Sequence, residues 1–261
     1  LSCHRSLANA QQELAHARTL IDTSDDNQGA ILGDFEAGDD LLTVQLPSEE
    51  EARPITPSDI AYILGVGRNR QAYVIEADAD QYLVLPFQWN TNSGEWASLE
   101  LAETFPDPAY DFTTQCAGCH TTNYRAETLS WGEAGVQCEA CHGPAQDHVS
   151  LADDAGSVLS DRELAEITGA VNFALDAQVC GQCHIRGSEP DGIHLFPIDY
   201  APGDDLLSES AYIPVDSTDE SHFFPTGHAI LPNMQFNEWL QSTHPQALTT
   251  APESDEFAAQ C

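Results

Sequence analysis

Residues 115–148 read QCAGCHTTNYRAETLSWGEAGVQCEACHGPAQDH, and this stretch decides how the chain is organised. It contains the pattern C-x-x-C-H twice, and a third copy follows later in the chain. The three copies consist of Cys116, Cys119 and His120; Cys138, Cys141 and His142; and Cys180, Cys183 and His184. In c-type haem attachment, two thiols bond the porphyrin and the adjacent histidine ligates the iron. Each copy therefore predicts one covalently bound haem c.

Paired C-x-x-C motifs also occur in structural zinc sites, where four thiolate or imidazole ligands surround the metal. A zinc site does not require a histidine directly after every second cysteine. All three complete copies have that histidine. We therefore favour haem over zinc.

Residues 135–148 resemble the G-V-x-C-E-x-C-H-G-P-x-x-x-H signature of bacterial multihaem c-type cytochromes. Other segments resemble further elements of that family: CGQCHIRG at 180–187, APGDDL at 201–206, WLQSTH at 239–244, and parts of 62–89, which resemble its β-rich insert. The resemblance implies that His148 and His244 are distal haem ligands. The family contains both electron carriers and multihaem reductases, so the resemblance predicts the cofactor better than the activity.

The two ends of the sequence contain parts of a fourth motif. Cys3-His4 matches the second half of C-x-x-C-H, and the segment EFAAQC ending at Cys261 matches DFTTQC at 111–116. Written end to start, Cys261-Leu1-Ser2-Cys3-His4 is a complete motif. The alternatives are a disulfide between Cys3 and Cys261, or two unrelated truncated ends. We expect four haems, and copies joined end to end, as tandem repeats or as head-to-tail subunits.

The ten histidines suffice for two axial ligands on each of four haems. The proximal set is His4, His120, His142 and His184. The predicted distal set is His148, His244, His228 and His16, with His194 and His222 in reserve. His16 has a solvated histidine as its alternative, and His244 has a buried, hydrogen-bonded one. The sequence does not assign distal histidines to particular haems.

The predicted fold is mainly irregular and α-helical, with a small β-hairpin insert, wrapped around a chain of haems. We expect one tetrahaem unit over 1–261, with an acidic, β-containing insert at 22–110 and a haem-dense part at 111–261. Helices are predicted at 6–21, from the Ser160/Glu163 capping box to 168, and from Asn233 towards His244. A hairpin is predicted from 73–75 and 82–85, a solvated surface excursion at 22–57, and an extended wrap at 187–232.

Acidic residues dominate the charge of the chain. There are 43 acidic residues and 8 basic ones, a net charge of −35, and every basic residue is arginine. This balance makes nucleic acid and anionic membranes unsuitable partners. High solubility and adaptation to high salt both explain it, because salt screens the self-repulsion.

The sequence favours electron transfer over enzyme catalysis. A multihaem reductase of a small nitrogen or sulfur oxyanion is the alternative, but it needs an open iron position and cationic groups, and the negative field opposes an anionic substrate. We expect redox proteins or extracellular acceptors as partners. Export is implied by the family, so the expected location is extracellular or at the cell surface, with the periplasm as alternative, in a filament resembling extracellular cytochrome wires. No signal peptide or membrane span is visible, and we expect that any export signal has been removed.

Overall fold

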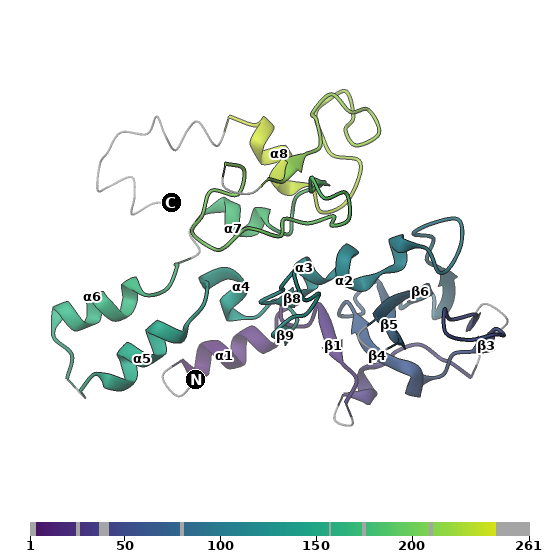
Figure 1. Cartoon of the computed structure of the whole chain (residues 1–261), viewed down its shortest axis with the longest axis horizontal. Coiled ribbons are helices and arrows are strands. Elements are labelled where there is room, and N and C mark those ends of the chain that lie inside the picture. Colours follow the sequence, from purple (N-terminus) through teal and green to yellow (C-terminus); the bar gives the residue numbers. More distant parts are fainter. Residues whose placement is uncertain are drawn as a thin grey trace. The chain divides into compact units, whose positions relative to one another are not determined.

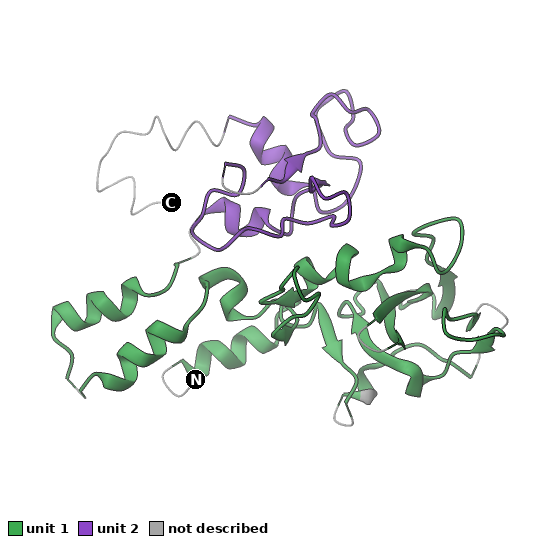
Figure 2. Cartoon of the chain, in the orientation of Figure 1, with its two compact units in different colours: residues 1–173 green, residues 174–261 purple. Residues whose placement is uncertain are grey.

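The computed structural model describes residues 4–24, 27–36, 42–78, 81–156, 158–173, 176–208 and 211–243. The chain divides into two compact units, Leu1–Phe173 and Ala174–Cys261 (Figure 2). The sequence predicts one tetrahaem unit over 1–261. That prediction is about the chain with its haems bound, and it stays a prediction. Within the described ranges, no helix is both long enough and apolar enough to cross a membrane.

The first unit contains a five-stranded antiparallel sheet with the strand order β1-β4-β5-β6-β7 (Figure 1). Its strands are β1 (Leu20–Asp22), β4 (Ile60–Leu64), β5 (Arg70–Asp78), β6 (Gln81–Asn90) and β7 (Glu95–Ser98). The predicted hairpin is confirmed as β5 and β6, whose β-branched and aromatic residues favour strands. The sequence predicts only a small hairpin insert. In the structure, the three strands β1, β4 and β7 extend this hairpin into a five-stranded sheet.

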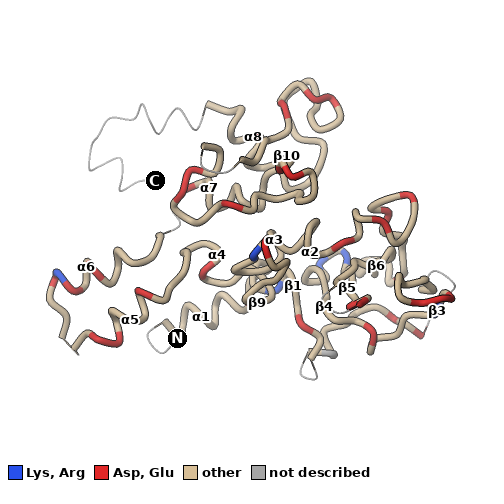
Figure 3. Tube along the Cα trace, viewed as in Figure 1, with Lys and Arg blue, Asp and Glu red and all other residues tan. Residues whose placement is uncertain are grey.

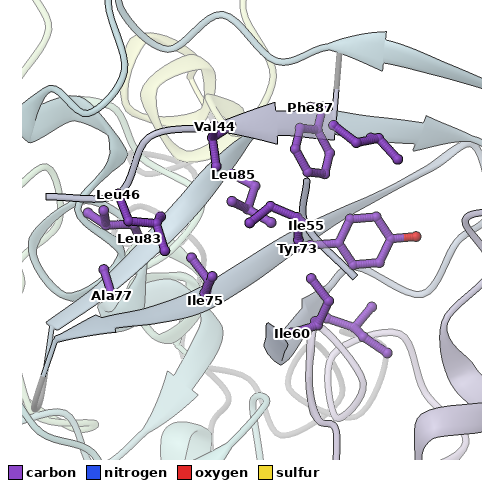
Figure 4. Packing of buried hydrophobic residues seen from close by; sticks show 12 residues of the cluster. Val44, Leu46, Ile55, Ile60, Tyr73, Ile75, Ala77, Leu83, Leu85 and Phe87 are labelled. Atoms are coloured by element: carbon purple, nitrogen blue, oxygen red, sulfur yellow. The ribbon is translucent and has the colours of Figure 1, made fainter. Parts of the chain in front are cut away.

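Side chains of β5 and β6 alternate between two buried clusters, as the period of a strand requires. Tyr73 and Ile75 belong to one cluster (Figure 4), and Val74 belongs to the other. The first cluster also contains Leu42, Val44, Leu46 and Ile55. The prediction of a solvated excursion at 22–57 is therefore wrong for these residues. Apolar side chains between the acidic runs cover one face of the sheet, next to the short strands β2 (Thr43–Val44) and β3 (Arg53–Pro54).

Helix α1 (Arg5–Gln12) is shorter than the helix predicted for 6–21. Turns follow it, and Leu20 and Ile21 pair with Leu64 and Ile63 in β4. Pairing with a strand distant in the sequence has overridden the local helical pattern. The helix is predicted because Leu7, Leu14 and Ile21 fall on one stripe, but that stripe is not a buried face, since 67% of Leu7 and 51% of Leu14 is exposed.

The rest of the first unit consists of short elements around the first two motifs. These are α2 (Phe112–Gln115), α3 (Ala117–His120), β8 (Thr121–Thr122), β9 (Glu133–Ala134), α4 (Cys138–His142), α5 (Gln146–Asp154) and α6 (Asp161–Gly169), with 3-10 helices at Gln28–Ala30, Pro57–Asp59 and Pro108–Tyr110. The predicted capping box is confirmed: Glu163 N donates to Ser160 Oγ at 3.3 Å, and Ser160 N donates to Glu163 Oε2 at 2.8 Å.

The second unit contains α7 (Ala177–Gly181), β10 (Gly187–Ser188), β11 (Ile213–Pro214) and α8 (Gln235–Gln241). Most of its other described residues form turns and bends around a core of Ile185, Leu206, Tyr212 and Phe236. Asn233 does not cap α8 as predicted. It adopts a positive φ of 59°, Met234 occupies the N-cap position, and the helix ends at Gln241, short of His244.

Candidate haem-binding sites

The first motif lies on two short helices at one face of the sheet. The Asp111 carboxylate begins α2 by accepting hydrogen bonds from Thr113 N at 2.9 Å and Thr114 N at 3.1 Å. Cys116 occupies the turn between α2 and α3, and His120 N donates to the Cys116 carbonyl at 3.2 Å. One turn of backbone therefore carries both cysteines and the histidine, as C-x-x-C-H attachment requires.

The ring of His120 is oriented by residue 19 of the α1–β1 connection. His120 Nδ1 lies 2.8 Å from Thr19 Oγ1 and 3.2 Å from the Thr19 carbonyl oxygen. Burial lowers the pKa of His120, although the contact with the Thr19 backbone opposes this effect. A lowered pKa favours the neutral imidazole, which is the form that binds a metal. Burial, with Cys119 and Asp111 nearby, also raises the pKa of the Cys116 thiol to about 12.

The second motif forms α4, and Gly143 ends this helix with a positive φ of 73°. His142 Nδ1 lies 2.6 Å from the carbonyl oxygen of Asn172. Asn172 N in turn donates to the His142 carbonyl at 3.0 Å. The backbone of a single residue after α6 therefore fixes both the main chain and the ring of His142.

Gly135 lies just before the second motif and packs against the first motif and the segment that follows α1. Its N–H donates to the His120 carbonyl at 3.0 Å, and its neighbour Val136 donates to the His16 carbonyl at 2.9 Å. A Cβ atom at position 135 would lie 2.0 Å from the Ala17 carbonyl oxygen, and the φ is +76°. Both constraints demand glycine here.

The third motif begins in α7, where the Asp176 carboxylate accepts from Gln178 N at 2.9 Å. His184 N donates to the Cys180 carbonyl at 3.0 Å, which repeats the backbone turn of the first motif. His184 Nδ1 lies 2.9 Å from Gln235 Oε1, and Phe236 N donates to the His184 carbonyl at 2.9 Å. The beginning of α8 therefore holds this histidine.

All three complete motifs share one arrangement. Each histidine has its Nδ1 within hydrogen-bonding distance of a protein oxygen from a segment distant in the sequence. Such a partner fixes the tautomer and the ring orientation and leaves Nε2 as the ligating nitrogen. The residues present therefore fit haem iron.

The distal candidates fall into two groups. His148, in α5, places Nδ1 2.8 Å from the Ile167 carbonyl oxygen of α6, as the motif histidines do. His16 lies exposed in the turns after α1, and the side chain of His228 is 81% exposed, 3.6 Å from Glu238 Oε1. The distal role of these three histidines stays a prediction.

The two reserve histidines have better-anchored rings than His228. Nδ1 of His194 lies 2.6 Å from Asp191, and Nδ1 of His222 lies 3.0 Å from Asp219. The sequence carries a signal for both, since each histidine follows its aspartate at the spacing D-x-x-H. Whether either of them serves as a distal ligand stays a prediction.

Three predicted ligands lie outside the described residues: Cys3, Cys261 and His244. The split motif and the distal role of His244 therefore stay predictions. The six cysteines of the complete motifs are free of disulfides. Within the described ranges, no three histidine, cysteine, aspartate or glutamate side chains group closely enough to hold a metal ion.

Repeated C-x-x-C-H turns with anchored histidines define a c-type haem protein. Residues 88–143 match the family described as cytochrome c554 and c-prime, and this region includes the first two motifs. The structure is similar to the crystal structure of the outer cell wall cytochrome OcwA, with a TM-score of 0.67 and 25% identity over 97% of this chain and 53% of that chain. The chain is a multihaem c-type cytochrome, and it spans about half the length of OcwA.

A weaker likeness connects the chain to an undecaheme cytochrome from the S-layer of Carboxydothermus ferrireducens. The TM-score is 0.41 and the identity 16%, over 99% of this chain and 36% of that one. No curated protein sequence matches the chain.

Proposed function

We propose that the protein transfers electrons through a chain of four c-type haems, each held by two histidines. The observation that carries this proposal is the hydrogen bond at Nδ1 of His120, His142 and His184, which leaves Nε2 for iron. Haem iron, when bound, supplies a one-electron couple. The protein contributes the orientation of the histidine rings and, within the first unit, a fold that holds the first two motifs.

The charge of the protein favours electron transfer over reduction of an oxyanion. Acidic residues are spread along both units, while few basic ones are visible (Figure 3). Arg53 pairs with Glu49 at 2.9 Å and Asp59 at 3.0 Å, and Arg162 pairs with Glu166 at 2.9 Å. Cations committed to such pairs contribute little attraction for an anionic substrate.

Electron paramagnetic resonance of the oxidised, haem-loaded protein tests the proposal, together with mass spectrometry of the denatured chain. We expect covalent haem on all three complete motifs and on the split motif, and low-spin ferric signals throughout. A high-spin ferric haem that binds nitrite or sulfite would favour the reductase. A chain without covalent haem would refute both functions.

We also propose that the protein works outside the cell, at its surface, in copies joined end to end. The likeness to an outer cell wall cytochrome supports the location. The association depends on the fourth motif, formed by Cys261 with Cys3 and His4. Digestion of the denatured protein after arginine tests it, since tandem repeats require a haem peptide that runs from Gly187 through Cys261 to Arg5 of the next copy. A free Cys261 on a 28.3 kDa chain would refute the covalent repeat.

A further inference from the structure

The rings of His4 and His148 lie close together in the first unit. Their centres are 6.1 Å apart and their planes are inclined by 30°. His4 is the N-cap residue of α1, and His148 lies in the first turn of α5. Segments far apart in this unit's sequence thus bring two histidines together at the N-terminal end of α1.

The separation of these rings matches two imidazoles that bind one metal from opposite sides. An imidazole nitrogen lies about 2.0 Å from a bound metal. Ring bonds close to the C–N length of about 1.33 Å place that nitrogen about 1.1 Å from the ring centre. Two rings on one iron would therefore have centres about 6.2 Å apart, which agrees with the observed 6.1 Å. Aromatic rings in direct contact have centres about 4.5–7 Å apart, so the distance alone also fits a plain stacked contact. The nitrogen chemistry of the two residues decides between the two arrangements.

The nitrogen chemistry of His148 supports the same arrangement. Its Nδ1 is 2.8 Å from the Ile167 carbonyl oxygen, so Nε2 is the nitrogen left to bind iron. His4 directly follows Cys3, in the order that places the proximal ligand after the second cysteine of C-x-x-C-H.

Apolar packing does not explain how α1 and α5 are held. None of the residues of α1 or of α5, all of which the structure describes, is buried. Leu7 of α1 is 67% exposed and Val149 of α5 is 52% exposed. Helices of 8 and 9 residues are too short to be stable without external contacts. α5 packs against α6, and Gln11 of α1 donates to the Val136 carbonyl at 3.0 Å. A cofactor bound by both helices would add contacts to these and would cover apolar surface.

We propose that His4 and His148 are the two axial ligands of one haem iron, which joins α1 to α5. This inference rests on the proposed haem binding and adds the pairing of ligands. His142 and His148, although close in the sequence, then serve different haems. The haem of His4 has both of its axial ligands within the first unit, whichever chain supplies the second thioether.

The pairing is tested by counting altered haems in His4→Ala, His148→Ala and the double variant, made in the full native polypeptide. Mass spectrometry of the denatured protein counts the haems that are attached. Electron paramagnetic resonance counts those that lose the low-spin state. Ser150→Ala, an exposed change in the same helix α5, is the matched control.

With a shared iron, the double variant has one altered haem, as each single variant does. If His4→Ala prevents attachment of its haem, the double variant retains only low-spin haems. His148→Met should give one haem with histidine–methionine ligation and a raised potential, and adding His4→Ala should remove that signature. Two altered haems in the double variant would overturn the pairing. Loss of haem from the unmodified protein would instead refute the proposed function.

Discussion

Replacing Gly135 with alanine tests whether close backbone packing positions the first two motifs. The new Cβ would lie 2.0 Å from the Ala17 carbonyl oxygen and 2.8 Å from its carbon, so one backbone segment must move. A left-handed conformation costs an alanine about 1–2 kcal/mol, and forced displacement in a packed region costs about 1–3 kcal/mol. We expect Gly135→Ala to destabilise the fold by about 2–5 kcal/mol.

Gly94→Ala separates the two costs. Gly94 also has a positive φ, of 67°, but a Cβ atom at this position would have no neighbouring atom within 4 Å. This control should lose only about 1–2 kcal/mol, and both variants share the entropic gain of replacing glycine in the unfolded chain. Urea denaturation of the haem-loaded protein, followed by circular dichroism and extrapolated to water, measures the difference. Equal losses in the two variants would refute the packing argument, because the close contact with Ala17 would then cost nothing.

Three further predictions concern a helix cap, acid and salt. Asp111→Ala should cost about 1 kcal/mol in the free energy of unfolding because it removes the cap of α2, and Asp111→Asn should restore most of it. Hydrogen bonds from the Ile193 backbone and the His194 ring lower the pKa of Asp191 from 3.8 to about 2, so the stability that its carboxylate provides is present above pH 3.8 and is lost as the pH falls towards 2. Acid titration of unfolding should be less steep over this interval in Asp191→Asn, and an unchanged slope would contradict the assignment. Raising salt from about 0.1 M to about 1 M should raise the unfolding temperature, since the Debye length falls from about 10 Å to 3 Å around a net charge of −35; a falling temperature would mean that attraction, not repulsion, dominates the surface.

Features set by neighbouring residues could be predicted from the sequence. The C-x-x-C-H turns depend on spacing alone, and the α6 capping box depends on Ser160 and Glu163. The β5–β6 hairpin follows from two runs of strand-forming residues separated by a short acidic turn. Each of these signals lies within a short window of the sequence, where local geometry decides the outcome.

Features set by distant partners could not be predicted. Ile21 falls on one helical stripe with Leu7 and Leu14, but in the structure it pairs with Ile63 of β4. The oxygens that orient His120 and His142 belong to Thr19 and Asn172, and most of them are backbone atoms that leave no trace in residue type. Pairing between strands distant in the sequence, such as β1 with β4, also explains why the structure has a five-stranded sheet where only a hairpin was predicted.

The two parts of the first unit are stabilised in different ways. The sheet buries large side chains such as Tyr73 and Phe87 completely, so it has a core built from protein alone. Helices α1, α4 and α5, which the structure describes in full, have no buried residue. Contacts of their histidines hold these helices instead: His142 with the Asn172 carbonyl, His148 with the Ile167 carbonyl, and the ring of His4 with that of His148. We therefore expect haem binding and folding to be coupled in the helical part, because ligands brought together by a metal contribute their binding free energy to the fold. The sheet, in contrast, places Cys116 and His120 on a support that needs no cofactor, since α2 packs its buried Phe112 against Val74 and Val84.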